Sequence, residues 1–183
     1  MRFQLIHNIT AGPISMDMYS VWEFPRFLIL LCGLVMIAKA DLKERIIPNQ
    51  MIMVLLAIRS ILLLQECVLS SDTWTHIVLP AVWGTLSGGG FFLICREISR
   101  GGVGAGDVKL FATIGYYLGG RVWNSILCSL FLASVWSLCL FLRGKGRWKK
   151  KIPLAPFVLA GTALAMLLET GGQDEIFYFL LYR

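Results

Sequence analysis

The sequence predicts an all-α fold, a polytopic membrane bundle of about six transmembrane helices. The chain of 183 residues is 57% hydrophobic and only 15% charged, and its mean hydropathy is +0.71. Soluble domains are typically about 45–50% apolar and about 25% charged. The apolar residues form long runs separated by short polar segments. A backbone in lipid must satisfy its own hydrogen bonds, so these runs favour helices.

The expected spans follow one another closely enough for a single domain over residues 1–183. They cover residues 24–40, 48–69, 77–95, 108–118, 122–142 and 153–168. Residues 1–23 lack the pattern of a signal peptide and are expected to form an interfacial lead-in. The fourth span is short, since 11 residues reach about 17 Å against a hydrocarbon core of about 30 Å. Three explanations are open: either residues 119–123 continue that helix, or the bilayer thins there, or Asp107 lies below the cytoplasmic membrane surface.

Basic residues are concentrated in alternate loops, within residues 39–45, 96–109 and 143–151. Cytoplasmic loops of membrane proteins carry an excess of Lys and Arg. We therefore expect these three loops on the cytoplasmic side and both termini outside. This orientation places Asp41 and Asp107 at the same, cytoplasmic face of a multi-pass membrane protein.

Composition also excludes several classes of function. The net charge of +6 does not indicate nucleic-acid binding, because the basic residues lie between membrane segments. The five cysteines contain no CxxC pair, so no zinc knuckle or redox motif is supported. His7 and His76 stand alone, without metal-ligand spacing. We expect no metal and no cofactor.

The glycine-dense segment of residues 101–106 leads directly into Asp107 and an apolar run. A carboxylate in or near a bilayer is rare and usually functional, and glycines allow a tight turn and close backbone approach. The structural alternative is that Asp107 caps a helix. The segment lacks the GxxxxGK motif of phosphate-binding loops and the GxGxxG motif of dinucleotide-binding folds.

Asp41 follows the first expected span and is the second acidic residue on this face. Two carboxyl groups that share one proton can activate water and protonate a carbonyl oxygen, which is the chemistry of amide hydrolysis. Helix ends predict the roles: Asp107 at an N-terminus is the expected base, and Asp41 near a C-terminus is the expected proton holder. The alternative for Asp41 is a solvated ion pair with Lys43 or Arg45.

Three further features predict packing or anchoring. Small residues recur at helical spacing and predict close contact between helices: Gly84, Ser87, Gly88 and Gly90. Arg59 falls near the middle of a span, where it is expected to pair inside the bundle or to snorkel outward. Lys109 lies two positions from Asp107, so a helix directs it elsewhere, and we expect it to anchor at the membrane surface.

Three segments resemble the active-site segments of the type IV prepilin peptidases. The first is Asp41-Leu42-Lys43 followed by Ile47-Pro48-Asn49, and the second is Gly104-Ala105-Gly106-Asp107-Val108-Lys109-Leu110. The third, Ile152-Pro153-Leu154-Ala155-Pro156-Phe157, is similar to the family's Ile-Pro-Phe-Gly-Pro-Phe. The likeness extends over residues 38–159, in the family's order and spacing.

The resemblance implies an aspartic protease of the bacterial inner membrane with Asp41 and Asp107 as its catalytic pair. Its substrates would be prepilins or pilin-like secretion subunits, cut on the cytoplasmic side after a short basic leader. The substrate's apolar helix would dock from the lipid bilayer, and pilus or secretion assembly proteins are candidate partners. Other matched positions are expected to shape the site or contact substrate: Gly104, Gly106, Lys109, Pro48, Asn49, Pro153 and Pro156.

The sequence departs from the family pattern in two places. It lacks the CxxC-bearing cytosolic domain of many bacterial members, so it resembles compact peptidase-only members, with additional N-methylation as an alternative. Ala155 replaces a usual glycine. Presenilin-like proteases share the GxGD motif, but their first aspartate usually follows tyrosine, whereas Asp41 follows Ala40. A non-catalytic scaffold for pilus or secretion assembly and a small transporter are the alternatives from other classes.

Overall fold

The structure is a computed structural model that describes residues 14–69, 74–143 and 153–171. Every regular element in these ranges is helical, which confirms the predicted fold class. In chain order the elements are α2 (Ile14–Glu44), α3 (Asn49–Leu69), α4 (Trp74–Ile98), α5 (Ala105–Leu118), the 3₁₀ helix η1 (Gly119–Arg121), α6 (Val122–Leu142) and α7 (Ala155–Gly171).

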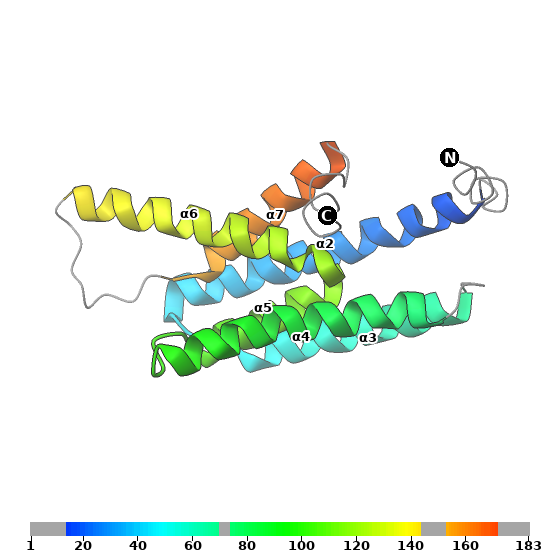
Figure 1. The fold of residues 1–183 in the computed structure, drawn as a ribbon, viewed down its shortest axis with the longest axis horizontal. Helices are drawn as coiled ribbons and strands as arrows, with labels where there is room; N and C mark the ends of the chain where they lie inside the picture. Colours follow the sequence, from blue (N-terminus) through cyan, green and yellow to red (C-terminus); the bar gives the residue numbers. More distant parts are fainter. Residues whose placement is uncertain (1–13, 70–73, 144–152, 172–183) are drawn as a thin grey trace, which may run out of the picture.

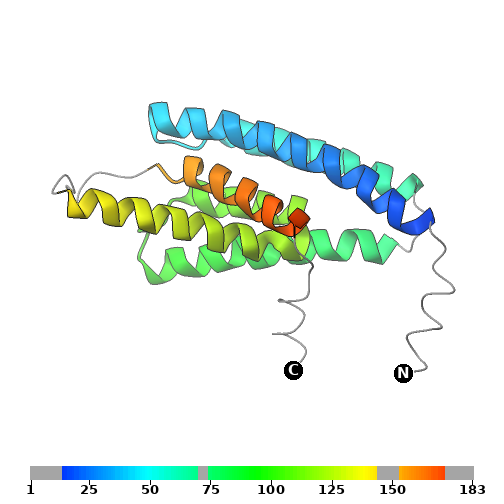
Figure 2. The same cartoon turned by 90° about the horizontal axis from the view of Figure 1, so that it is seen from above.

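The helices form an elongated bundle (Figure 1). The α4 helix packs along α5, α6 packs along α7, and α2 contacts both α7 and α3. Seen from above, α2 and α3 lie together on one side of the bundle (Figure 2). The last turn of α2, the start of α3, the α4–α5 loop and the start of α7 lie at the same end, on the left of Figure 1. We call this the loop end.

Most helices occupy the predicted apolar runs, with ends shifted by a few residues. The exception is the first one, because α2 begins at Ile14 rather than at residue 24 and includes Pro25 in its interior. Residues 14–23 of the expected lead-in are therefore helical, and residues 1–13 lie outside the described ranges. The α5 helix begins at Ala105 rather than at residue 108.

Three described stretches are long and apolar enough to cross a membrane: Asn49–Leu69, Ile77–Ile98 and Ala105–Leu142, the last of which contains α5, η1 and α6. A shorter apolar helix covers Ala155–Leu168. These stretches confirm the prediction of a helical membrane protein. The count of six membrane spans stays a prediction.

The chain turns sharply after α5. Gly119 has a φ of 61°, a left-handed conformation that favours glycine, and its amide donates to the carbonyl of Gly115. The α6 helix then runs back toward the loop end (Figure 1). The gap between the expected spans of residues 108–118 and 122–142 is therefore a turn. A straight continuation of the short fourth helix is excluded, and its 14 residues reach about 21 Å.

Glycines bring α4 and α5 together backbone to backbone. A Cβ atom added to Gly84 would overlap the carbonyl oxygen of Gly115, and one added to Gly88 would lie 2.9 Å from the Phe111 carbonyl oxygen. The predicted close packing is confirmed at these two glycines. Gly90 takes no part in it, because a Cβ there would meet no atom within 4 Å.

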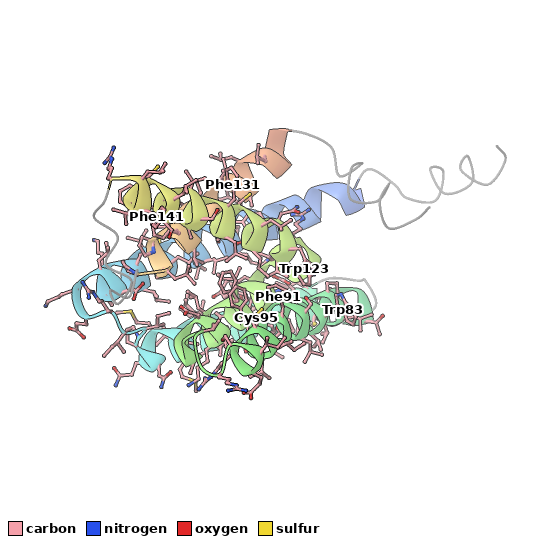
Figure 3. All side chains as sticks on the ribbon, turned by 60° about the vertical axis from the view of Figure 1, so that its left-hand side comes forward. Trp83, Phe91, Cys95, Trp123, Phe131 and Phe141 are labelled. Carbon is pink, nitrogen blue, oxygen red and sulfur yellow. The ribbon has the colours of Figure 1, made fainter. Side chains whose placement is uncertain are left out.

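Aromatic rings fill the space between α4, α5 and α6. Phe91 of α4 and Trp123 of α6 meet edge to face, with ring centroids 5.4 Å apart and planes at 70° (Figure 3). Phe92 stacks on Phe111 at 3.9 Å. Such contacts contribute about 0.5–1.5 kcal/mol each beyond the area that they bury.

A buried ion pair joins α3 to its neighbours. Arg59 is 1% exposed, and its Nη1 lies 3.0 Å from Oε1 of Glu66. The Arg59 Nε donates to the carbonyl oxygen of Tyr116 on α5 at 3.2 Å, and Arg26 of α2 lies 3.5 Å from the same Glu66 oxygen. Pairing inside the bundle is therefore confirmed for Arg59, and outward snorkelling is excluded.

Candidate active site

Asp41 lies in the last turn of α2 and is only 6% exposed, although Lys43, Glu44 and Arg45 beside it are exposed. Neither ion pair found in the described ranges involves Asp41, so the expected alternative of a solvated surface pair is wrong. Its Oδ2 accepts a hydrogen bond from the backbone N–H of Ala155 at 2.9 Å. Asp41 is therefore a buried carboxylate held at the start of α7.

Asp107 is the third residue of α5 and is half-buried. The residue that caps α5 is Gly104, which is extended with φ −66° and ψ 142°, so the expected alternative of Asp107 as the cap is wrong. The Asp107 carboxylate interacts with the backbone of Gly104 and is close enough to Asp41 for the two negative charges to repel each other. Folding thus brings together two acids that are far apart in the sequence.

The two glycines of the GxGD segment keep space for different neighbours. A Cβ atom on Gly104 would lie 3.1 Å from the Oδ2 of Asp107. One on Gly106 would lie 3.0 Å from the Cβ of Ile47 in the loop after α2. Gly104 therefore gives room to the carboxylate, and Gly106 allows the first turn of α5 to pack against the loop that follows Asp41.

Lys109 and Asn49 connect the first turn of α5 to the first residue of α3. The Lys109 Nζ donates to the Asn49 Oδ1 at 3.0 Å in an exposed position. Pro48 immediately precedes α3, and its carbonyl oxygen accepts from the Met51 N–H at 3.2 Å. The exposure fits a surface lysine, but the sequence did not predict that Lys109 and Asn49, two candidate site residues, contact each other.

Pro153 and Pro156 lie on either side of Ala155 at the start of α7. The carbonyl oxygen of Leu154 accepts from the N–H groups of Phe157 and Val158 at 3.0 and 3.1 Å, which begins the helix. Sequence reasoning noted Ala155 only as a replacement for glycine and missed its contact with Asp41. The two prolines that frame it are the signal that pointed there.

A hollow of about 430 Å³ lies between α2 and α3. Its lining is apolar apart from one amide side chain: Leu28, Ile29, Cys32, Gly33, Met36, Gln50, Met51, Val54, Leu55 and Ile58. Neither Asp41 nor Asp107 lines it, so the hollow is separate from the paired acids. The acids themselves share the loop end of the bundle.

These features define a class: a helical membrane protein with two carboxylates within electrostatic reach of each other at one end of its bundle. The family model described as the type IV leader peptidase family matches residues 28–142. The chain belongs to this family. The matched region includes both Asp41 and Asp107 but ends before α7.

Curated relatives agree with this assignment. The chain is 29% identical over 155 residues to a "Prepilin leader peptidase/N-methyltransferase" of Bacillus subtilis (strain 168), with 84% of this chain and 57% of that protein covered. It is 33% identical over 111 residues to a protein of the same name in Burkholderia pseudomallei (strain 1026b), with 55% and 33% covered. The chain therefore spans little more than half the length of the first relative. No solved structure matches significantly.

Proposed function

We propose that this chain is a membrane aspartic endopeptidase that removes the leader peptide from type IV prepilins or pilin-like secretion subunits. The observation that carries the proposal is that Asp41 and Asp107 lie within electrostatic reach of each other at the loop end, in a chain of the leader peptidase family. In the proposed site the two carboxyl groups share one proton, because mutual repulsion disfavours ionisation of both.

In the proposed reaction, the ionised carboxylate takes a proton from a water molecule, and the water oxygen attacks the scissile carbonyl carbon. The protonated carboxyl donates its proton to the carbonyl oxygen, which gives a tetrahedral diol. The carboxyl that gained the water proton then passes it to the departing amine nitrogen as the C–N bond breaks. The other carboxylate recovers a proton from the diol as the C=O bond reforms, so one water is consumed and the pair is regenerated.

Helix ends predict Asp107 as the base, and this assignment remains a hypothesis. The C-terminus of α2 disfavours negative charge on Asp41. The start of α7 lies at the same carboxylate through the Ala155 amide, and an N-terminus favours negative charge. The two helix ends near Asp41 therefore act in opposite directions.

We place the loop end at the cytoplasmic face of a bacterial inner membrane. Lys39, Lys43 and Arg45 at the end of α2 are exposed, as is Arg100 beyond the end of α4. This concentration of basic residues is typical of cytoplasmic loops. The paired acids would then meet their substrate at the inner membrane surface.

A cleavage assay with purified components tests the proposal. The parent protein in detergent is mixed with a prepilin, beside the Asp41→Asn and Asp107→Asn variants and a Glu44→Gln control. Glu44 is an exposed acid in the same turn as Asp41, so this control removes a nearby charge without touching the pair. We expect the parent and the control to cleave, and each Asn variant to lose on the order of 10³-fold or more in rate.

Full cleavage by both Asn variants would contradict the proposed pair. Absence of cleavage by the parent, with several prepilins, would favour the alternative of a scaffold. The curated relatives' names also include N-methyltransferase. The mass of the new N-terminus, measured with S-adenosylmethionine present, reports whether methyl transfer accompanies cleavage.

A further inference from the structure

The hydrogen bond between Asp41 and Ala155 is buried on both sides. Asp41 is 6% exposed and Ala155 is 1% exposed, and the N–H of Ala155 lies 2.9 Å from the Asp41 Oδ2. The proposed reaction needs two close carboxylates, but it does not by itself require this third group. Its role therefore needs a separate explanation.

The amide of Ala155 has no acceptor within α7 because of its position at the start of the helix. The first N–H groups of a helix have no acceptor within the helix. Phe157 and Val158 both donate to Leu154, and Pro156 has no N–H to donate. Ala155, the first residue of α7, is thus a donor without a helical acceptor, and the Asp41 carboxylate satisfies it.

The α7 helix that carries this amide is firmly packed. The hydroxyl groups of Ser125 and Thr162 are hydrogen-bonded at 2.6 Å in the interior between α6 and α7. A Cβ atom on Gly161 would overlap the backbone of Ser129, so the two helices approach closely. Val158 is fully buried in the same core as Ala155. The donor therefore belongs to a rigid part of the bundle.

We propose that the backbone amide of Ala155 is the positioning group for Asp41. It fixes one carboxylate oxygen, so that Asp41 keeps one orientation toward Asp107. A charge-assisted hydrogen bond of this kind also stabilises negative charge on the oxygen that accepts it. This inference rests on the proposed peptidase function, and it explains why two prolines frame a single amide at the start of α7.

The sharpest perturbation replaces Ala155 by lactic acid, which turns the N–H into an ester oxygen and adds no atoms. The matched control replaces Ala160 by lactic acid, because this residue is also alanine in α7 and is exposed. The Ala155→Pro variant removes the same N–H by ordinary mutagenesis, at a first helical position that tolerates proline. Cleavage of a prepilin by each protein gives kcat and KM.

Loss of a hydrogen bond to a charged group predicts a fall in kcat of about 10- to 150-fold for the Ala155 ester, with KM changed less than about threefold. The Ala160 ester should keep the parent kcat, since it removes an amide that does not contact the pair. Parent-like kcat in the Ala155 ester would overturn the proposal, as would equal losses in both esters.

Hydrogen exchange tests the contact without any cleavage. The Ala155 amide should exchange faster in Asp41→Ala than in the parent, and it should be unchanged in Asp107→Ala. If no prepilin is cleaved by the parent, the peptidase proposal fails, and the exchange result still decides whether Asp41 holds this amide. Equal exchange in the parent and Asp41→Ala would overturn the positioning role.

Discussion

Replacing Glu66 by glutamine removes the carboxylate that pairs with two guanidinium groups inside the bundle. Arg59 lies 3.0 Å from Glu66 and Arg26 lies 3.5 Å from it. A separate double-mutant cycle compares the parent with Arg59→Met, Glu66→Met and the double variant with methionine at both positions. The cycle measures whether the pair stabilises the protein through mutual attraction or only through the volume that it fills.

The distances set the expected size of the effect. Two unit charges 3.0 Å apart attract by about 5.5 kcal/mol at an effective dielectric constant of about 20, before the cost of desolvation. Breaking a buried pair costs about 3–5 kcal/mol. Arg59 keeps its hydrogen bond to the Tyr116 carbonyl oxygen, so we expect Glu66→Gln to lower the free energy of unfolding by about 3 kcal/mol, the low end of that range. Arg59→Met should cost less, about 2 kcal/mol, because Glu66 keeps Arg26.

The double methionine variant should be within about 2 kcal/mol of the parent or more stable, since an apolar pair avoids desolvation. The measurement is equilibrium unfolding of the purified protein in mixed detergent micelles, followed by tryptophan fluorescence. Arg59 lies ten residues after Asn49, about 15 Å along α3, so prepilin cleavage below the unfolding range should be unchanged. Additive single effects, within about 0.5 kcal/mol, would refute the coupling.

Two other changes test the loop end. Gly104→Ala places a methyl group 3.1 Å from the Asp107 carboxylate, so kcat for prepilin cleavage should fall at least about tenfold. The control Gly90→Ala adds a methyl group where no atom lies within 4 Å, so it should cleave like the parent. Equal kcat in Gly104→Ala and the parent would contradict the crowding argument. Lys109→Met removes the hydrogen bond from Lys109 to Asn49. Because this hydrogen bond is exposed, its loss should lower thermal stability by less than about 1 kcal/mol. Adding Asn49→Ala should cause no further loss, and an additive loss would show that the two side chains act separately.

Hydropathy predicted the fold class and the approximate place of each helix, because apolar length and short polar loops leave few alternatives in lipid. Motif resemblance predicted Asp41 and Asp107 as a catalytic pair. Their charges are near enough to interact, and the catalytic pairing stays a prediction. Single-helix periodicity also predicted part of the α4–α5 contact. The periodic pattern included Gly90, where an added Cβ would have no atom within 4 Å. The pattern omitted Gly89, where an added Cβ would lie 2.8 Å from the Cβ of Ala112. One residue shifts a side chain by about 100° around a helix, and only the partner helix decides which face is used.

The burial of Asp41 could not be predicted from its neighbours. The four residues that follow it are exposed, and three of them are charged, so the local pattern indicates a solvated helix end. Asp41 is covered because α7 returns to this place and directs one amide at it. The Lys109–Asn49 contact was missed for a related reason, since each side chain alone is typical of a surface. Contacts between distant segments depend on packing that no local window contains.

The short α5 helix does not need to match the thickness of a bilayer. Its 14 residues span about 21 Å, about 9 Å less than a hydrocarbon core of about 30 Å, and Gly119 then reverses the chain. No residue from Leu110 to Gly119 is exposed, so neighbouring helices surround this segment. Backbone that leaves the helical path at membrane depth is tolerated where protein buries it. The length of the helix that carries Asp107 is therefore set by packing inside the bundle.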